Sequence, residues 1–203
     1  MATSVARDKL LASAARLFYA RGITASGVDT IVAESGVSKP TLYAHFHTKN
    51  DLVAAVLEDR HRRRRASLES YLAQRSELSA RNRLLSVFDW IAGHQHGAWA
   101  RGCPFVNASV ELVRVEDAAA RNVVRAHKRW FRGVLAGLAT EAGALDPAAI
   151  ASGLHLLIEG ANARMLAEDD LTGIADARHA GEVLLAAAIP AGTDARAHRG
   201  QGG

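Results

Sequence analysis

The chain has 203 residues, 49% of them hydrophobic, which is enough to bury the core of one domain with a small appendage. It is rich in Ala, Leu, Arg and Glu and poor in aromatic residues, which favours helices over sheets, and its single cysteine excludes an internal disulfide. The net charge of +4 is concentrated in residues 1–65, where 11 Lys or Arg stand against 6 Asp or Glu, so we expect an anionic partner there, nucleic acid before a membrane surface.

Four helices are expected in the first third of the chain. Apolar residues at helical spacing predict the first over residues 7–22, and a short second helix follows from Val28. Gly36 ends the second helix, because glycine accepts the left-handed conformation of a tight helix exit. Ser38 can cap a two-turn third helix, and residues 48–51, Thr-Lys-Asn-Asp, resemble a capping box that begins a longer fourth one.

The rest of the chain shows the same periodicity. A break at residues 102–104, Gly-Cys-Pro, separates two helices, and Pro190 ends the last one. The five helices expected here centre on or span residues 84–91, 106–113, 117–142, 147–168 and 176–189. We therefore predict an all-α bundle of about nine helices.

A glycine turn joins the second and third expected helices. Residues 28–46 have the sequence VDTIVAESGVSKPTLYAHF, in which two short helices with a polar outer face predict a helix-turn-helix. The outer face of its second helix presents Lys39, Thr41, Tyr43 and His45, which can reach phosphates and base edges in the major groove. The alternative is a helix pair with solvated polar residues, in which Tyr43 serves packing.

This motif and its flanks resemble the DNA-binding signature of the TetR family of regulators. The resemblance covers residues 7–57 and rests on the segment GVDTIVAESGVSKPTLYAHFHTKNDLVAAVL. It implies phosphate contacts from Ser38, Tyr43, His45 and Lys49, base contacts from Lys39 and Thr41, and room for a thymine methyl at Ala44.

The resemblance also implies an architecture and a mode of action. We expect a DNA-binding head over residues 1–48, an effector-binding and dimerisation domain over residues 49–190 and a disordered tail over residues 191–203. Two copies would pair through their last two helices, hold a palindromic operator as a repressor and release it when a small molecule binds. The segment GCPFVNASVEL, residues 102–112, resembles a stretch found in the effector domains of one subgroup.

The effector site itself is expected between helices of the bundle. Such a pocket needs an apolar lining with a few oriented polar groups, and polar side chains on an apolar helix face are costly to bury without a partner. The candidate lining residues are Phe88, Phe105, Asn107, Trp130, His155 and Glu159. Each of them could instead belong to the core, the surface or an interface.

Two cationic or reactive features remain open to two interpretations. Cys103, near Arg101, could be a redox or electrophile sensor, although a lone cysteine beside proline is more often a small buried hydrophobe. The run of residues 60–65, Arg-His-Arg-Arg-Arg-Arg, could grip DNA or acidic lipid, but we favour a solvated helix face.

Other classes of function have less support. His155 and Glu159 at i, i+4 and the pair His94 and His96 could ligate a metal, but no third ligand converges in sequence, so we expect no metal and no cofactor. The chain has no phosphate loop or nucleophile elbow, so we expect no enzyme activity. It also lacks a run of roughly 18 apolar residues and the apolar segment of a secretion signal, so we expect a soluble, cytoplasmic protein.

Overall fold

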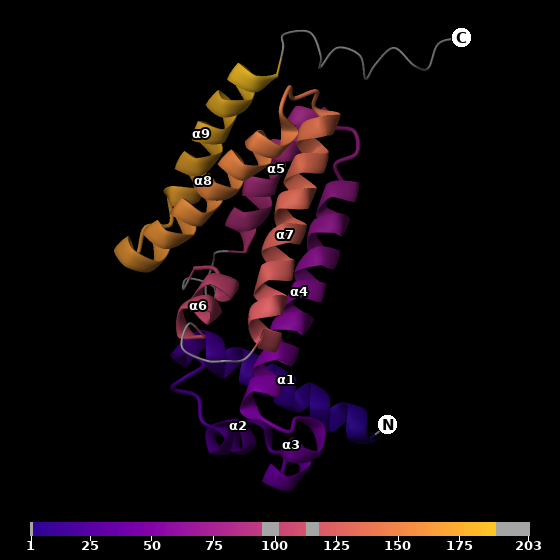
Figure 1. Ribbon diagram of the computed structural model, residues 1–203, viewed down its shortest axis with the longest axis vertical. Helices are drawn as coiled ribbons and strands as arrows, with labels where there is room; N and C mark the ends of the chain where they lie inside the picture. Colours follow the sequence, from indigo (N-terminus) through magenta and orange to yellow (C-terminus); the bar gives the residue numbers. More distant parts are fainter. Residues whose placement is uncertain (1, 95–101, 113–117, 190–203) are drawn as a thin grey trace, which may run out of the picture. The chain divides into compact units, whose positions relative to one another are not determined.

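The computed structural model describes residues 2–94, 102–112 and 118–189, and every element in these ranges is an α-helix (Figure 1). The helices are α1 (Ala2–Arg21), α2 (Val28–Ser35), α3 (Lys39–His45), α4 (Lys49–Ala73), α5 (Ala80–Gly93), α6 (Pro104–Glu111), α7 (Ala118–Glu141), α8 (Pro147–Glu168) and α9 (Gly173–Ala188). None of these helices is long and apolar enough to cross a membrane. The prediction of an all-α fold is confirmed; the expected tail, residues 191–203, lies outside the described residues.

The chain forms two compact units. The first unit consists of Met1–Arg64 and Cys103–His127, and the second of Arg65–Gly102 and Lys128–Gly203. The first unit therefore contains α6 and the beginnings of α4 and α7 as well as the three N-terminal helices. The functional division expected at residue 48 does not coincide with a boundary between these units and stays a prediction.

Local signals set the ends of the N-terminal helices. Gly36 has a φ of 65° and its N–H donates to the Val32 carbonyl, which ends α2. Thr48 and Asp51 each accept a hydrogen bond from the other's backbone N–H, at 3.1 and 2.9 Å, so the capping box before α4 is confirmed. Two starts are earlier than predicted: α1 begins at Ala2, and α9 at Gly173.

The first unit has its own apolar core. Side chains that expose none of their surface include one large apolar residue from each of α1, α2, α3, α4 and α6, namely Leu10, Ile31, Leu42, Leu52 and Phe105. Burying a side chain of this size stabilises a fold by about 1.5–3 kcal/mol. One such residue from each helix therefore fixes the short helices α2 and α3 against longer ones.

In the second unit α8 and α9 lie side by side (Figure 1) and approach closely at glycines. A Cβ added to Gly153 would lie 2.9 Å from Leu184 Cδ2, and one added to Gly181 would lie 3.1 Å from Leu154 Cδ2 and 3.3 Å from the Phe88 ring. The second contact brings α5 into the same core. Larger residues at these two positions would push the helices apart.

Candidate nucleic-acid interface and effector site

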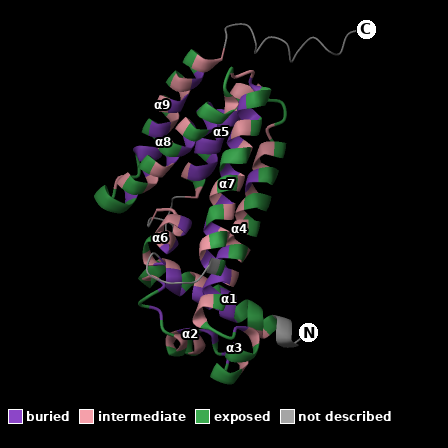
Figure 2. Ribbon diagram, viewed as in Figure 1, coloured by how far each residue is buried: buried purple, intermediate pink, exposed green. Residues whose placement is uncertain are grey.

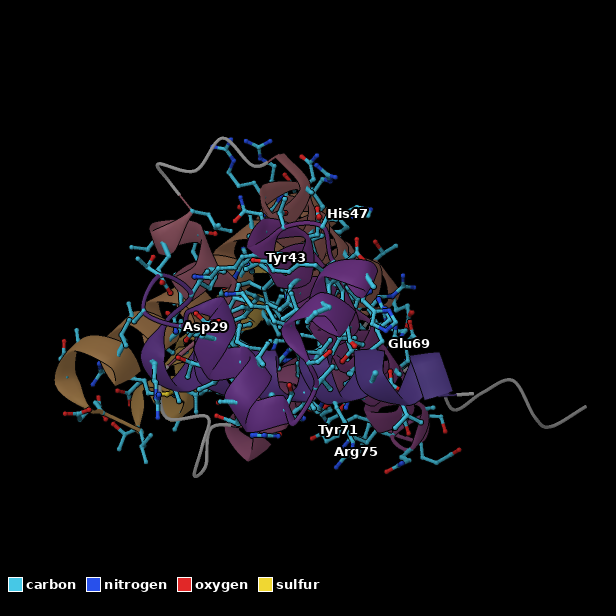
Figure 3. The ribbon with its side chains drawn as sticks, turned by 90° about the horizontal axis from the view of Figure 1, so that it is seen from below. Asp29, Tyr43, His47, Glu69, Tyr71 and Arg75 are labelled. Carbon is cyan, nitrogen blue, oxygen red and sulfur yellow. The ribbon has the colours of Figure 1, made fainter. Side chains whose placement is uncertain are left out.

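Helix α3 carries a polar outer face on a buried apolar anchor. Leu42 and, just after the helix, Phe46 are buried, whereas Lys39 and Tyr43 are exposed, with 42% of the tyrosine accessible (Figure 2). Figure 3, turned by 90° from Figure 1 and seen from below, labels Asp29 of α2 and Tyr43 of α3. The sequence interpretation of α3 as a helix with an inner and an outer face is consistent with this burial.

The other predicted contact residues of α3 are partly engaged within the protein. Thr41 and His45 are half-buried, and the His45 ring lies 6.2 Å from that of Phe46. Ser38 Oγ accepts a hydrogen bond from the Thr41 N–H at 3.3 Å and lies 2.8 Å from Thr41 Oγ1. Ser38 is thus the N-cap that the sequence predicted, and its hydroxyl is held at the first turn of the helix.

Lys39 forms an ion pair that the sequence analysis did not anticipate. Its Nζ lies 2.8 Å from Asp29 Oδ1, across the turn between α2 and α3. Hydrogen bonding to this carboxylate, reinforced by its charge, raises the pKa of Lys39. The ammonium is therefore accessible but already has an anionic neighbour.

Lys49 is half-buried at the start of α4. Its Nζ donates to the Ile23 carbonyl at 2.5 Å. Burial lowers the pKa of Lys49 by more than the charge of the Glu111 carboxylate raises it, so the net shift is downward. The resemblance implies a phosphate contact from this lysine, and one hydrogen bond to a carbonyl uses only one of the three N–H donors of its ammonium. That role stays a prediction.

Part of the basic run at residues 60–65 faces the protein interior, which corrects the expectation of a solvated face. Arg62, Arg63 and Arg65 are exposed, whereas Arg60 and Arg64, one helical turn apart, are half-buried. Burial and the neighbouring charge of Arg64 lower the pKa of Arg60 to about 10, and the Arg60 guanidinium lies 5.4 Å from the centre of the Tyr19 ring. Within this run, the two half-buried arginines therefore pack against the protein and the three exposed ones face solvent.

The six candidate effector residues are divided between the two units. Phe105 and Asn107 belong to the first unit, and Phe88, Trp130, His155 and Glu159 to the second. The structure thus groups the second set in one unit but does not place all six in one site.

In the first unit, Phe105 packs on His127, which in turn meets a second histidine. Its ring stacks on that of His127, with 3.6 Å between centroids, and His127 Nδ1 lies 3.0 Å from His61 Nδ1. Asn107 lines a small cavity of about 30 Å³ together with Tyr19, Arg60, Glu111 and apolar residues of α1, α4 and α6. A cavity of that size holds about one water molecule and no drug-sized ligand.

In the second unit, the two polar candidates share a network with a residue that the sequence did not single out. Glu159 Oε1 accepts a hydrogen bond from Lys128 Nζ at 2.6 Å and lies 3.4 Å from His155 Nε2. Burial raises the pKa of Glu159, but the neighbouring His155 and the charge of Lys128 outweigh it, so the net shift is downward. The His155 ring meets Phe131 edge-on at 5.9 Å.

The two remaining candidates of the second unit are aromatic, and the Trp130 ring lies 6.0 Å from that of Phe131. Phe88 is buried against Gly181 of α9 and serves the core, while Trp130 is half-buried with the Arg65 guanidinium 6.0 Å from the centre of its ring. His94 bonds to the Trp90 carbonyl at 2.6 Å, and His96 lies outside the described residues. Within the described parts of the chain, no three His, Cys, Asp or Glu side chains gather as metal ligands would.

Cys103 occupies the N-cap position of α6 and is half-buried. The side chains of Arg60 and Arg64 lie close enough for a charge on Cys103 to raise their pKa values, against the lowering effect of burial. The cation near this thiol is thus supplied by α4. The sequence had suggested Arg101, which lies outside the described residues.

Two family models and a solved structure match this chain. Residues 10–56 match the family model of bacterial regulatory proteins, tetR family, and residues 80–181 match that of a tetracyclin repressor-like C-terminal domain. SCO4454, a TetR-family transcriptional regulator from Streptomyces coelicolor, has a crystal structure that matches with a TM-score of 0.83 at 33% identity, over 92% of this chain and 97% of that one.

Two curated relatives are similar over shorter stretches. The transcriptional repressor DhaR of Mycobacterium sp. (strain GP1) is 29% identical over 132 residues, which is 65% of each chain. The transcriptional activator FasR of Mycolicibacterium smegmatis is 48% identical over 52 residues, 26% of this chain and 24% of that one, so the chain spans less than two thirds of either relative. The two family models and the S. coelicolor structure show that the chain belongs to the TetR family of transcriptional regulators.

Proposed function

We propose that the protein is a dimeric repressor that binds a palindromic operator through α3 and is released by a small molecule bound in its second unit. The observation that carries the proposal is the outer face of α3, which presents Lys39 and Tyr43 on a helix anchored by Leu42. A rigid helix with short and flexible polar groups suits the major groove. As a DNA-binding regulator it would act in the cytoplasm.

The contacts divide by role. Ser38, Tyr43, His45 and Lys49 hold phosphates, while Lys39 and Thr41 face base edges. Fluorescence anisotropy with labelled duplexes tests this division: Lys49→Ala weakens binding to all sequences and flattens its salt dependence, whereas Lys39→Ala changes base preference. Identical effects of both substitutions would contradict the assignment.

The dimer is supported by the outer faces of α8 and α9. Leu156 on α8 is 69% exposed and Val183 on α9 is 61% exposed, so each of these two helices presents a large apolar side chain outward. Their exposed neighbours at helical spacing are mostly small: Ser152, Gly160 and Ala163 on α8, and His179, Ala186 and Ala187 on α9. A second copy is the partner proposed, because two recognition helices related by a two-fold axis are needed for two operator half-sites.

Sedimentation tests the dimer. Val183→Glu places a charge in the proposed interface and should give monomers, whereas Leu145→Glu, at a site 80% exposed outside α8 and α9, should leave the dimer intact. If both variants sediment like the parent protein, this interface is wrong.

The effector proposal rests on the polar network of the second unit. A small, largely apolar molecule with one polar group would displace part of the interactions among Lys128, His155 and Glu159. Such displacement is needed because a ligand shifts a protein between two conformations only if it interacts differently with each of them. His155→Leu or Glu159→Leu should keep DNA binding and lose release by a compound identified by thermal-shift screening. Retained release in both variants would exclude these residues from the site.

A second candidate function is thiol sensing by Cys103, because the half-buried guanidinium groups of Arg60 and Arg64 lie near it. Attack of the thiolate on a peroxide oxygen would give a sulfenic acid and release water or an alcohol. If peroxide releases DNA from the parent protein but not from Cys103→Ser, the thiol is the sensor. Release of both or of neither would exclude it.

A further inference from the structure

The turn between α1 and α2 is held from two sides by side chains of opposite charge. On one side, Lys49 of α4 donates from Nζ to the Ile23 carbonyl at 2.5 Å. On the other, Glu111 at the end of α6 accepts the Thr24 N–H through Oε2 at 2.7 Å. All of these residues belong to the first unit, so one carboxylate and one ammonium bind neighbouring groups of the same short turn.

The carboxylate packs directly on the backbone of this turn. A Cβ added to Gly22 would lie 3.1 Å from Glu111 Oε2, and the φ of 93° at Gly22 already disfavours any other residue there. A hydrogen bond from a backbone N–H to a carboxylate is stronger than one between neutral groups. Glu111 is therefore fixed beside the turn.

The position of Glu111 is unfavourable for α6 itself. A negative charge at the C-terminal end of a helix opposes the helix dipole, so the local helix does not account for an acidic residue at this position. Its favourable interactions come from elsewhere. The Thr24 N–H donates to its carboxylate, and the Lys49 ammonium lies on the other side of the same peptide group, where the charge of Glu111 opposes the burial that on balance lowers the pKa of Lys49.

We propose that in the free protein the carboxylate of Glu111 attracts the Lys49 ammonium across the Ile23–Thr24 peptide group, and in this way competes with the operator backbone for that ammonium. This inference rests on the proposed phosphate contact of Lys49. When DNA binds, the Lys49 ammonium turns toward a phosphate and away from the Glu111 carboxylate, and the weakened attraction between these two charges lowers DNA affinity. Because phosphates carry no sequence information, the effect is the same for every duplex.

The test is a double-substitution cycle on the full chain, measured by anisotropy at low salt with a labelled mixed-sequence duplex of about 30 base pairs. Glu111→Gln removes the charge and keeps an oxygen that can accept the Thr24 N–H. It should tighten binding up to about fivefold, the upper end for one exposed ion pair. In a Lys49→Met background the same substitution should change nothing. Glu58→Gln, which removes an exposed carboxylate from α4, is the matched control and should change affinity less than twofold.

Three results would overturn the proposal: weaker binding by Glu111→Gln, equal tightening in the Lys49→Met background, or equal tightening by Glu58→Gln. A second measurement needs no variant at Glu111. The ¹⁵Nζ signal of Lys49 in the parent protein should shift when the duplex is added, and an unchanged signal with the duplex bound would contradict the exchange of partners. If the parent protein binds no duplex at low salt, the proposed function fails, which is distinct from DNA binding that is insensitive to Glu111.

Discussion

Removing the hydroxyl of Ser38 should loosen α3 and weaken DNA binding. In Ser38→Ala the Thr41 N–H loses its acceptor at the first turn of a seven-residue helix. Loss of such an N-cap costs about 1 kcal/mol, which corresponds to about fivefold faster hydrogen exchange where the helix opens locally. Hydrogen-exchange mass spectrometry of the segment around α3 measures this change, and anisotropy measures the loss of DNA binding.

The chain supplies a matched control for this substitution. Ser79 caps α5 with the same geometry, accepting the Asn82 N–H at 3.3 Å, so Ser79→Ala should loosen α5 to a similar extent and leave DNA binding unchanged. Ser38→Gly separates the two roles of the hydroxyl, helix capping and the proposed phosphate contact, because glycine is worse as a cap by only about 0.3 kcal/mol. We expect Ser38→Gly to keep α3 protected and still bind DNA less tightly. Equal DNA binding by Ser38→Ala and the parent protein would refute this account of Ser38.

Three further predictions concern other contacts. Asp29→Asn removes the carboxylate beside Lys39 and should strengthen binding to mixed-sequence duplex in an anisotropy titration; weaker binding would show that the pair positions the lysine for DNA. Gly137→Ala on an open face of α7 should raise the free energy of unfolding, measured by urea titration, by about 0.5–1 kcal/mol. The free energy of unfolding of Gly181→Ala should lie at least about 1 kcal/mol below that of Gly137→Ala, because the added Cβ meets packed side chains. The pKa of Glu159 is lowered, so its ionised form stabilises the fold above about pH 4.3, and this contribution is lost as the pH falls through the folded-state pKa. The difference in the free energy of unfolding between the parent protein and Glu159→Gln should therefore shrink in acid. A difference that stays constant from neutral to acidic pH would contradict this prediction.

The features that the sequence predicted well are those that depend on near neighbours in the chain. Gly36 ends α2, Ser38 caps α3, and the capping box at residues 48–51 begins α4, because each of these signals is read within about four residues. The same local patterns determine which face of α3 is buried. The helix-turn-helix could therefore be located from sequence.

The features that the sequence could not predict join residues far apart in the chain. Glu111 binds the backbone of Thr24 across 87 positions, and Lys128 reaches Glu159 across 31. Arg60 and Arg64 were expected on a solvated face because a run of like charges conceals which residues face inward; the i, i+4 spacing of the two inward residues was the available signal. The pairing of charges thus requires the tertiary structure.

Selection of duplexes from a random-sequence pool by the purified protein tests the central claim most directly. A dimer that places two copies of α3 in successive major grooves should enrich an inverted repeat whose half-site centres lie about 10 base pairs apart or slightly more. Enrichment of a single asymmetric half-site, or binding without any enriched sequence, would contradict the proposal of a dimeric, operator-specific regulator.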